Sequence, residues 1–224
     1  MTARAQDLQI AGLTALSTCD WPGKLAATVF LQGCPLACTY CHNPALRDPR
    51  APGTVGWHEV RDLLARRRGL LDGVVFSGGE PTRQRGLAAA MREVRAAGFG
   101  VGLHTAGVYP HRFAAVLPLC DWVGLDIKAP EHLYEAVTGR PAGAAKAFEC
   151  LQVALASRVD LQVRTTVDPT VMRPHDVARL TDALHARGVR EHVLQEVRTQ
   201  GTTPQFAARL EAFRDRAAGL ASLA

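Results

Sequence analysis

The sequence alternates between short apolar runs, rich in β-branched residues, and longer amphipathic stretches, and this alternation restricts the fold more than any other feature. Each short run has the length and composition of a buried β-strand, and the stretches between them have the spacing of amphipathic helices. Regular strand–helix alternation predicts right-handed crossovers and a parallel sheet, and the almost continuously apolar strands indicate a sheet that is covered on both faces. The six predicted strands cover residues 26–31, 73–77, 101–105, 122–127, 161–167 and 192–197.

The amphipathic stretches predict the helices. One of these helices is expected to end at Gly98, because glycine is common just beyond a helix C-terminus. The apolar faces of the first two predicted helices consist of Val60, Leu63 and Leu64 and of Leu87, Met91 and Val94. Further helices are predicted over residues 110–117, 142–156, 175–187 and 204–218.

The length of the chain, 224 residues, limits how many β/α units it can contain. A complete eight-unit barrel takes ~250 residues, so the six predicted units indicate an α/β fold with a partial (β/α)6 barrel of parallel strands. No linker, repeat or low-complexity tract divides the sequence. We therefore predict a single domain with an N-terminal extension (1–24), a core (25–198) and a C-terminal helix (199–224).

Composition narrows the class of protein. Apolar residues make up 47% and charged residues 21%, which is typical of a globular protein and excludes wholesale disorder. The net charge of +5 comes from arginines spread along the chain, whereas a nucleic-acid-binding protein gathers its basic residues. No apolar run approaches the ~20 residues of a membrane helix, and no apolar signal core follows Arg4. We expect a cytoplasmic protein that binds neither nucleic acid nor membrane.

Polar residues and glycines gather where the predicted strands end. In a parallel α/β fold the carboxyl ends of the strands share one edge of the sheet, and ligands bind there. Six polar strand ends that face one way can line a site for one cofactor. These residues are Gln32, Gly33, Ser77, Gly78, Gly79, Glu80, His104, Thr105, Asp126, Lys128, Arg164, Thr165, Thr166, Gln195 and Glu196.

The strongest chemical signal is the group of three cysteines, Cys34, Cys38 and Cys41, directly after the first predicted strand. Soft thiolates in a reducing compartment indicate zinc or an iron–sulfur cluster. A structural zinc site needs a fourth ligand, for which Cys19 is a candidate. An iron–sulfur cluster on three cysteines instead leaves one iron open to another ligand, as catalytic metal sites do. The spacing by itself leaves both kinds of site open.

The sequence around these cysteines, residues 33–44, resembles the cluster loop of the radical S-adenosylmethionine (SAM) superfamily, including the aromatic Tyr40 before the third cysteine. The resemblance implies a partial barrel, a [4Fe-4S] cluster on the three cysteines, and SAM bound to the fourth iron. It also implies one-electron reduction of SAM to methionine and a 5′-deoxyadenosyl radical, which removes a hydrogen atom from a substrate. The cofactors would carry the chemistry, and the protein would place and shield them.

The motif Gly78-Gly79-Glu80-Pro81 resembles the glycine-rich segment after the second strand of this superfamily. Glycines allow a backbone to approach a ligand closely. The resemblance implies that Gly78 and Gly79 lie against SAM and that Glu80 accepts hydrogen bonds from its ammonium group.

Asp126 and Lys128 resemble the Asp-x-Lys pair of glycyl-radical activating enzymes. Their period-two spacing places both side chains on one face of the strand. The resemblance implies that Asp126 binds ribose hydroxyls and that Lys128 offsets negative charge on the ligand or the cluster. The alternative is a buried ion pair without a ligand contact.

Arg164, Thr165 and Gln195 extend the resemblance to the last two strands. Arg164 resembles the family's contact to the carboxylate or ribose of SAM, and its forked donors suit a carboxylate. A structural salt bridge is the alternative for this arginine. Gln195 resembles the residue that closes the adenosine pocket, and Thr165 is a weaker candidate contact.

Larger blocks resemble the glycyl-radical activating enzymes, and in particular the short bacterial activating proteins of anaerobic ribonucleoside-triphosphate reductases. This resemblance implies removal of a hydrogen atom from one glycine Cα of that partner enzyme, with electrons from a donor such as flavodoxin or ferredoxin. The open side of a partial barrel would admit the loop that carries the glycine. The blocks cover residues 20–24, 41–44, 69–81 and 164–167.

His104 departs from the pattern of this branch, which often has an aspartate at this strand end. In some relatives that aspartate helps to hold a monovalent cation beside the SAM carboxylate. An imidazole offers no carboxylate oxygen, so a cation site is doubtful in this chain. Two interpretations of His104 stay open: it faces SAM as a cation or donor, or local hydrogen bonds satisfy it.

Two other functions stay open on the sequence. A radical SAM enzyme that acts on a small molecule, such as a deazaguanine-forming synthase, shares the cluster loop but needs a polar pocket for its substrate. The block at residues 20–24 favours the activase. A zinc-binding interaction protein without catalytic activity is the third interpretation, and analysis of iron and acid-labile sulfide separates it from the first two.

Overall fold

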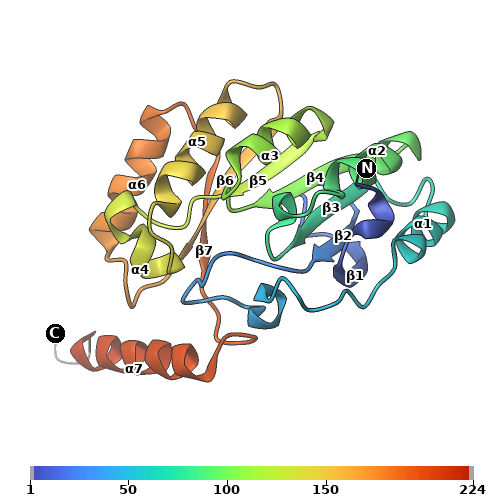
Figure 1. The fold of residues 1–224 in the computed structure, drawn as a ribbon. Helices are drawn as coiled ribbons and strands as arrows, with labels where there is room; N and C mark the ends of the chain where they lie inside the picture. Colours follow the sequence, from blue (N-terminus) through green and yellow to red (C-terminus); the bar gives the residue numbers. More distant parts are fainter. Residues whose placement is uncertain (1–2, 222–224) are drawn as a thin grey trace.

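A computed structural model of the chain describes residues 3–221, and a seven-stranded sheet forms its centre (Figure 1). The strands neighbour one another in chain order, and each neighbouring pair from β2 onward is parallel. The predicted α/β class and its parallel strands are therefore confirmed. The strands are β1 (Ile10–Ser17), β2 (Ala26–Leu31), β3 (Gly73–Gly78), β4 (Gly100–Thr105), β5 (Trp122–Asp126), β6 (Asp160–Val167) and β7 (His192–Glu196).

Strand β1 is not among the six predicted strands, and it pairs antiparallel with β2. Its sequence mixes small and polar residues with few large apolar ones, and most of its residues are half-exposed or exposed. It therefore lacks the continuous apolar character of a covered strand. The six predicted strands correspond to β2 to β7, and β1 is an additional strand in the segment expected to be an N-terminal extension.

Helices connect the parallel strands and cover the outer face of the sheet (Figure 1). The predicted helices are present, with ends shifted by a few residues at most, and Gly98 follows the second one with a φ of +88°. Residues 222–224 of the predicted C-terminal segment lie outside the described residues. The helices are α1 (Trp57–Arg66), α2 (Leu87–Ala96), α3 (Pro110–Val116), α4 (Tyr134–Thr138), α5 (Gly143–Leu155), α6 (Pro174–Ala186) and α7 (Pro204–Ala221). Short 3₁₀ helices cover Ala5–Asp7, Pro44–Arg47, Pro81–Arg83, Leu117–Leu119 and Glu131–Leu133.

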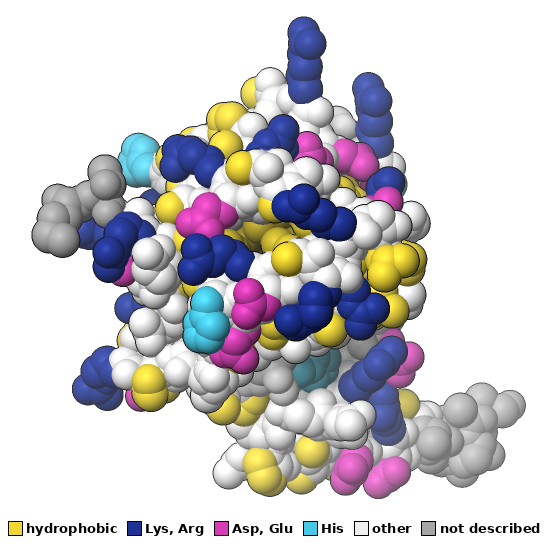
Figure 2. Space-filling view, turned by 90° about the vertical axis from the view of Figure 1, so that its right-hand side faces the viewer, with side chains coloured by type: hydrophobic (Ala, Val, Ile, Leu, Met, Phe, Trp, Pro, Cys, Tyr) yellow, Lys and Arg dark blue, Asp and Glu magenta, His cyan; other side chains and the backbone are white. Residues whose placement is uncertain are grey.

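Charged side chains of both signs are spread over the face of the molecule shown in Figure 2. On this face, Lys and Arg side chains are interspersed with Asp and Glu. This distribution agrees with a positive charge that reflects overall composition. Among residues 3–221, no helix combines the length and the apolar character needed to cross a membrane.

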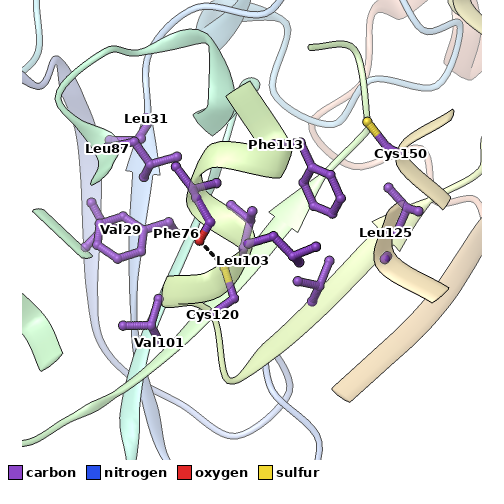
Figure 3. Packing of buried hydrophobic residues seen from close by; sticks show 14 of the residues in the cluster. Val29, Leu31, Phe76, Leu87, Val101, Leu103, Phe113, Cys120, Leu125 and Cys150 are labelled. Atoms are coloured by element: carbon purple, nitrogen blue, oxygen red, sulfur yellow. Dashed lines mark hydrogen bonds between the residues drawn. The ribbon is translucent and has the colours of Figure 1, made fainter. Parts of the chain in front are cut away.

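Aliphatic and aromatic side chains fill the space between the sheet and its helices (Figure 3). Alternate strand residues point to this outer face, where Phe76, Leu103 and Leu125 are fully buried. Leu87 of α2 and Phe113 of α3 belong to the same cluster. Burial of a side chain of this size stabilises the fold by about 1.5–3 kcal/mol, so this layer is the main source of stability.

The inner face of the sheet is packed with tryptophans over glycines. Trp21, Ala26, Val75 and Trp122 form a separate apolar cluster, in which the two indole rings stack with centroids 5.8 Å apart. A Cβ atom at Gly73 would lie 2.8 Å from the Trp21 ring, so glycine is required where this ring crosses β3. The rings occupy the inner side of the sheet, and the strand ends next to them carry polar side chains.

Candidate active site

The carboxyl ends of the parallel strands and the cysteine loop surround a cavity of about 260 Å³. This is the edge of the sheet at which the sequence predicts ligand binding. Cys34, Cys38 and Cys41 all line the cavity. The other predicted residues that line it are Tyr40, Gly78, Gly79, His104, Asp126, Lys128, Arg164 and Gln195.

The cysteine loop follows β2 and is held from two sides. The backbone N–H of Ala37 donates to the Thr138 carbonyl at 2.8 Å, and that of Thr39 donates to the Val137 carbonyl at 2.9 Å. The Thr39 hydroxyl donates to the buried Asp168 carboxylate at 2.6 Å. Helix α4 and the segment after β6 therefore fix the loop that presents the thiols.

The three thiols share the cavity. Cys34 and Cys38 pack against an apolar cluster of Leu36, Ala106 and Val108. Burial raises the pKa of Cys34 to about 12 and also raises that of Cys38, so metal binding would release protons from both. Within residues 3–221, no three His, Cys, Asp or Glu side chains meet as ligands of one metal ion. The three thiols instead line the cavity.

Tyr40 precedes the third cysteine, and its side chain is almost fully buried in the cavity wall. Among the described residues, its Oη is the one buried side-chain nitrogen or oxygen without a hydrogen-bond partner. Leaving such a hydroxyl unpaired costs about 1–3 kcal/mol. Lys128 Nζ lies 5.9 Å from the ring centroid. Tyr40 therefore brings an uncommitted donor and acceptor to the site.

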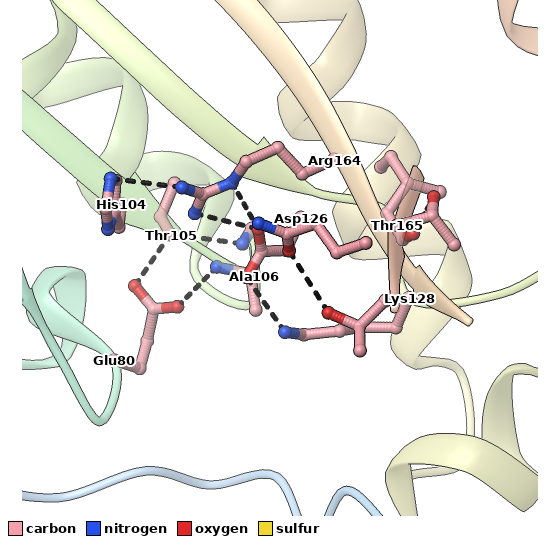
Figure 4. A network of polar contacts seen from close by, with 12 residues as sticks. Glu80, His104, Thr105, Ala106, Asp126, Lys128, Arg164 and Thr165 are labelled. Atoms are coloured by element: carbon pink, nitrogen blue, oxygen red, sulfur yellow. Dashed lines mark hydrogen bonds and ion pairs between the residues drawn. The ribbon is translucent and has the colours of Figure 1, made fainter. Parts of the chain in front are cut away.

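Asp126 is the centre of a partly buried charge network at the end of β5 (Figure 4). Its Oδ1 accepts hydrogen bonds from Arg164 Nε and Nη2 at 2.9 Å, and its Oδ2 accepts from Lys128 Nζ at 2.8 Å. Burial alone would raise the pKa of Asp126, but the two cations outweigh burial and hold that pKa well below its usual range. The carboxylate in turn raises the pKa of Lys128 against the effect of burial. The residues thus form the ion pairs of the alternative interpretation and also line the cavity.

His104, in β4, lines the cavity and is held by its neighbours. Its Nε2 lies 2.7 Å from the Asp20 carbonyl oxygen and 3.1 Å from Arg164 Nη1. Its Nδ1 lies 3.1 Å from the Ser77 hydroxyl oxygen. Burial and the nearby Arg164 guanidinium lower the pKa of His104 to about 4. The ring is therefore neutral at neutral pH, which favours local hydrogen bonding over a cationic role.

Glu80 does not line the cavity, and Figure 4 shows its carboxylate hydrogen-bonded to Thr105 and Ala106. Its carboxylate is fully buried and accepts from the Thr82 hydroxyl at 2.5 Å, the Thr105 hydroxyl at 2.7 Å and the Ala106 N–H at 2.9 Å. Burial raises the pKa of Glu80, and these hydrogen bonds oppose the increase. The structure therefore uses Glu80 to join the ends of β3 and β4, and its carboxylate is not among the groups that line the cavity.

The glycine pair at the end of β3 lines the cavity, but its closest approach is to the chain itself. Gly78 has a φ of +109°, a conformation that favours glycine. A Cβ atom at Gly79 would lie 2.5 Å from the Gly33 carbonyl oxygen. Glycine is thus required here, and the group that comes close is the backbone that leads into the cysteine loop.

Thr165 and Gln195 have different positions. The Thr165 hydroxyl is buried away from the cavity, where it donates to the Ile127 carbonyl at 2.7 Å. The next residue, Thr166, lines the cavity and donates to Gln195 Oε1 at 3.2 Å. Side chains alternate between the two faces of a strand, so a shift of one residue along β6 separates the predicted contact from the observed lining residue. Gln195 is exposed at the rim.

Arg47 lines the cavity but was not singled out from the sequence. Ser77, Thr105 and Thr166, which the sequence places among the polar strand ends, also line the cavity. Arg47 comes from the loop beyond the cysteines and has no comparable signal.

The other cysteines lie elsewhere. Cys19 is exposed beside the Ser17 hydroxyl and does not line the cavity. Cys120 and Cys150 are buried in the outer core, where their thiols donate to carbonyl groups (Figure 3). The arrangement therefore does not offer Cys19 as a fourth ligand.

The chain is similar in sequence to known proteins of one superfamily. The family model of the radical SAM superfamily matches residues 28–185. A protein of Methanocaldococcus jannaschii named as a glycyl-radical enzyme activating enzyme is 32% identical over 178 residues, which cover 75% of this chain and 72% of the relative. The pyruvate formate-lyase-activating enzyme of Clostridium pasteurianum is 31% identical over 138 residues, 59% of this chain and 58% of that enzyme.

The chain is also similar to an enzyme that is not named as an activating enzyme and to a solved structure. A 7-carboxy-7-deazaguanine synthase of Methanopyrus kandleri is 32% identical over 130 residues, 49% of this chain and 52% of the synthase. The structure of Streptococcus suis SuiB bound to S-adenosylmethionine has a TM-score of 0.63 at 12% identity, and the match covers 82% of this chain and 45% of SuiB. At this identity the structural similarity concerns the fold alone.

Proposed function

The chain belongs to the radical SAM superfamily, and from this membership we propose that it is an activase that cleaves SAM reductively and removes a hydrogen atom from a glycine of a partner enzyme. One observation carries the proposal: three thiols of a single loop share one cavity with the partly buried network of Asp126, Lys128 and Arg164. Two relatives are named as activating enzymes, which supports the proposal that this chain is an activase.

The residues present fit the cofactors of the superfamily, a [4Fe-4S] cluster and SAM. Thiolates are the usual ligands of such a cluster, and Cys34, Cys38 and Cys41 surround a cavity of about 260 Å³. The uncommitted hydroxyl of Tyr40 can bind a polar group in the same cavity. When bound, the cluster supplies one electron to the sulfonium of SAM, which yields methionine and the 5′-deoxyadenosyl radical that takes up the hydrogen atom.

The charged residues of the cavity are proposed to bind and orient SAM. Asp126 stays ionised between two cations and retains lone pairs for ribose hydroxyls. Arg164 keeps N–H groups for a carboxylate, and Lys128 offsets the negative charge of the three thiolates. Because all three side chains are fixed by one another, little ordering remains to be done when the ligand binds.

The remaining residues shape the pocket. We propose that Tyr40, Gly78, Gly79 and His104 form its walls and that Gln195 closes its rim, because all five line the cavity. Glu80 and Thr165 are proposed to act from behind the wall, as positioning residues that hold the strand ends by hydrogen bonds.

The open barrel supports a macromolecular substrate. The sheet ends in β1 on one side and β7 on the other, so it does not close on itself. We propose anaerobic ribonucleoside-triphosphate reductase as the partner and a flavodoxin or ferredoxin as the electron donor, on the sequence blocks alone. Part of the block at 20–24 has a structural explanation, since the Asp20 carbonyl holds His104 and Trp21 packs inside the barrel.

Anaerobic reconstitution followed by incubation with SAM and dithionite tests the activity. We expect about four irons and four sulfides per chain, and equal amounts of methionine and 5′-deoxyadenosine by chromatography. An intact cluster that forms no 5′-deoxyadenosine would contradict the proposal. One zinc per chain with no sulfide would favour the zinc-binding interaction protein.

A radical SAM enzyme of a small molecule is the second candidate, because the similarity to the deazaguanine synthase covers about half of each chain. Both candidates form 5′-deoxyadenosine, so the origin of the transferred hydrogen discriminates between them. With reductase labelled by deuterium at glycine Cα, deuterium in the 5′-deoxyadenosine supports the activase. Absence of deuterium from 5′-deoxyadenosine that forms at an undiminished rate supports the small-molecule enzyme.

A further inference from the structure

The two edge strands of the sheet, β1 and β7, differ in whether another segment of the chain bonds to their outer edge. On β1, the N–H groups of Thr54 and Val55 donate to the Ile10 carbonyl at 2.7 and 3.1 Å, and the Thr54 hydroxyl donates to the Ala11 carbonyl at 3.0 Å. This segment covers the start of that edge. On β7, within the described part of the chain, no backbone group of another segment bonds to the edge that faces away from β6.

In β7, the backbone N–H and C=O groups of Leu194 face the open edge of the sheet. The Val163 N–H of β6 donates to the Glu191 carbonyl, and backbone groups alternate in direction along a strand. His192, Leu194 and Glu196 therefore direct their N–H and C=O groups away from β6. Exposed edges are usually protected by proline, charged side chains or a bulge. Residues 192–196 contain no proline or lysine, their register with β6 is regular, and their one acidic side chain, Glu196, pairs with Arg214 of α7.

An apolar groove adjoins this edge and connects it to the cavity. Leu194 is 49% exposed, and with Val167, Val197 and Phe213 it lines a groove of about 420 Å³ between β7 and α7. Gln195 lines both this groove and the candidate active-site cavity. A chain that lies along β7 therefore reaches the mouth of the cavity without a gap.

We propose that the glycine-bearing segment of the protein substrate docks on β7 in an extended conformation, as an eighth strand of the sheet. Its main chain pairs with the outward N–H and C=O groups of Leu194, an apolar side chain enters the groove, and the glycine lies at the cavity mouth beside Gln195. Strand addition of this kind takes affinity from the backbone and selectivity from side-chain pockets. An extended polypeptide is the occupant that matches this row of backbone groups. The inference rests on the proposed function and adds the place where its substrate binds.

Two substitutions at Leu194 test the docking with purified anaerobic ribonucleotide reductase as the probe. Leu194→Pro removes the outward N–H and leaves the ladder with β6 intact, and Leu194→Arg places a charge in the groove. The matched control is Leu16→Arg, at a leucine of the other edge strand that is 51% exposed. We measure glycyl-radical formation against reductase concentration, and 5′-deoxyadenosine formation without reductase.

We expect both Leu194 variants to raise the KM for the reductase by about tenfold or more. Formation of 5′-deoxyadenosine without reductase should stay within about twofold of the wild type, which also shows that the variants fold. Leu16→Arg should change neither quantity. An unchanged KM in the two Leu194 variants would overturn the docking site.

Hydrogen exchange of the unsubstituted chain provides a second readout that does not depend on turnover. The amides of Leu194 and Glu196 should exchange more slowly when reductase is added, whereas the amide of Leu16 should not change. Protection elsewhere with none in residues 192–196 overturns the docking on β7. Failure of the wild type to form 5′-deoxyadenosine from SAM would instead overturn the proposed function.

Discussion

The two faces of the sheet are made by the same strands but serve different purposes. The outer face carries large apolar side chains such as Phe76 and Leu103, which pack against the helices. The inner face carries tryptophans over glycines and, at the strand ends, the charged network around Asp126. Neighbours in sequence, such as Leu103 and His104, therefore belong to the core and to the cavity. Substitutions on the outer face should affect stability alone, and those on the inner face should also affect the cofactor chemistry.

The largest contrast is expected between two cysteines. Cys38→Ala removes a thiol of the cavity and should abolish both the cluster and the formation of 5′-deoxyadenosine, because a cuboidal cluster needs its protein thiolates. Cys120→Ala removes a thiol of the outer core and should lower the free energy of unfolding by about 1 kcal/mol with the iron content unchanged. Iron and sulfide analysis measures both variants, and retained turnover in Cys38→Ala would refute the assignment of this ligand.

A smaller but still large effect is expected from the charge network. Asp126→Asn leaves Arg164 and Lys128 buried without their counter-charge, which should cost about 3–5 kcal/mol and reduce SAM cleavage by about 100-fold or more. Asp121→Asn is the matched control, because Asp121 pairs with Arg95 at the surface and asparagine can still accept from the Val101 N–H. The control should cost no more than about 1 kcal/mol. Chemical denaturation and 5′-deoxyadenosine assays measure both, and equal losses in the two variants would contradict the contrast.

On the outer face, a substitution should lower stability and leave SAM cleavage nearly unchanged. Phe113→Ala removes a fully buried ring that packs between α3 and the sheet, and it should cost about 3–5 kcal/mol of stability. At a temperature where the variant stays folded, SAM cleavage should stay within about twofold of the wild type, because the ring does not line the cavity. A selective loss of activity in a folded, cluster-loaded Phe113→Ala protein would show that the two faces are coupled.

The smallest effect concerns the pH dependence of stability. The pKa of His104 falls to about 4 on folding from an ordinary value of about 6.5, so the unfolded chain binds the extra proton between these two values. His104 therefore makes no pH-dependent contribution above pH 6.5, and the free energy of unfolding falls as the pH drops from 6.5 toward 4, with a slope of at most about 1.4 kcal/mol per pH unit. The charged residues that face the His104 ring from other elements are Arg164, which lowers its pKa, and Asp126 and Asp20, which raise it.

His104→Gln should flatten that slope between pH 7 and 5, measured by chemical denaturation at each pH. His111→Gln, at an exposed histidine in α3, is the matched control and should keep the slope of the wild type. The same slope in all three proteins would show that His104 does not lose its proton on folding.

Much of the fold could be predicted from the sequence, because apolar runs long enough to form covered strands stand out from the helices between them. Strand β1 could not, since its residues are small, mixed and half-exposed. For the candidate site, the spacing of the cysteines and of Asp126 and Lys128 indicated the residues that share the cavity.

What the sequence pattern lacked was the direction of individual side chains and the contacts between distant segments. The motif around Glu80 identifies the residue but not that its carboxylate turns inward to Thr105 and Ala106. The support of the cysteine loop by Asp168 joins residues far apart in the sequence, and no local pattern signals it. Such contacts depend on the assembled sheet.

Electron paramagnetic resonance of the chain mixed anaerobically with SAM, dithionite and anaerobic ribonucleotide reductase tests the central claim most directly. The account predicts a glycyl-radical doublet on the reductase, formed together with 5′-deoxyadenosine and absent when Cys38→Ala replaces the wild type. A loaded cluster that cleaves SAM in the presence of the reductase but produces no glycyl radical would contradict it.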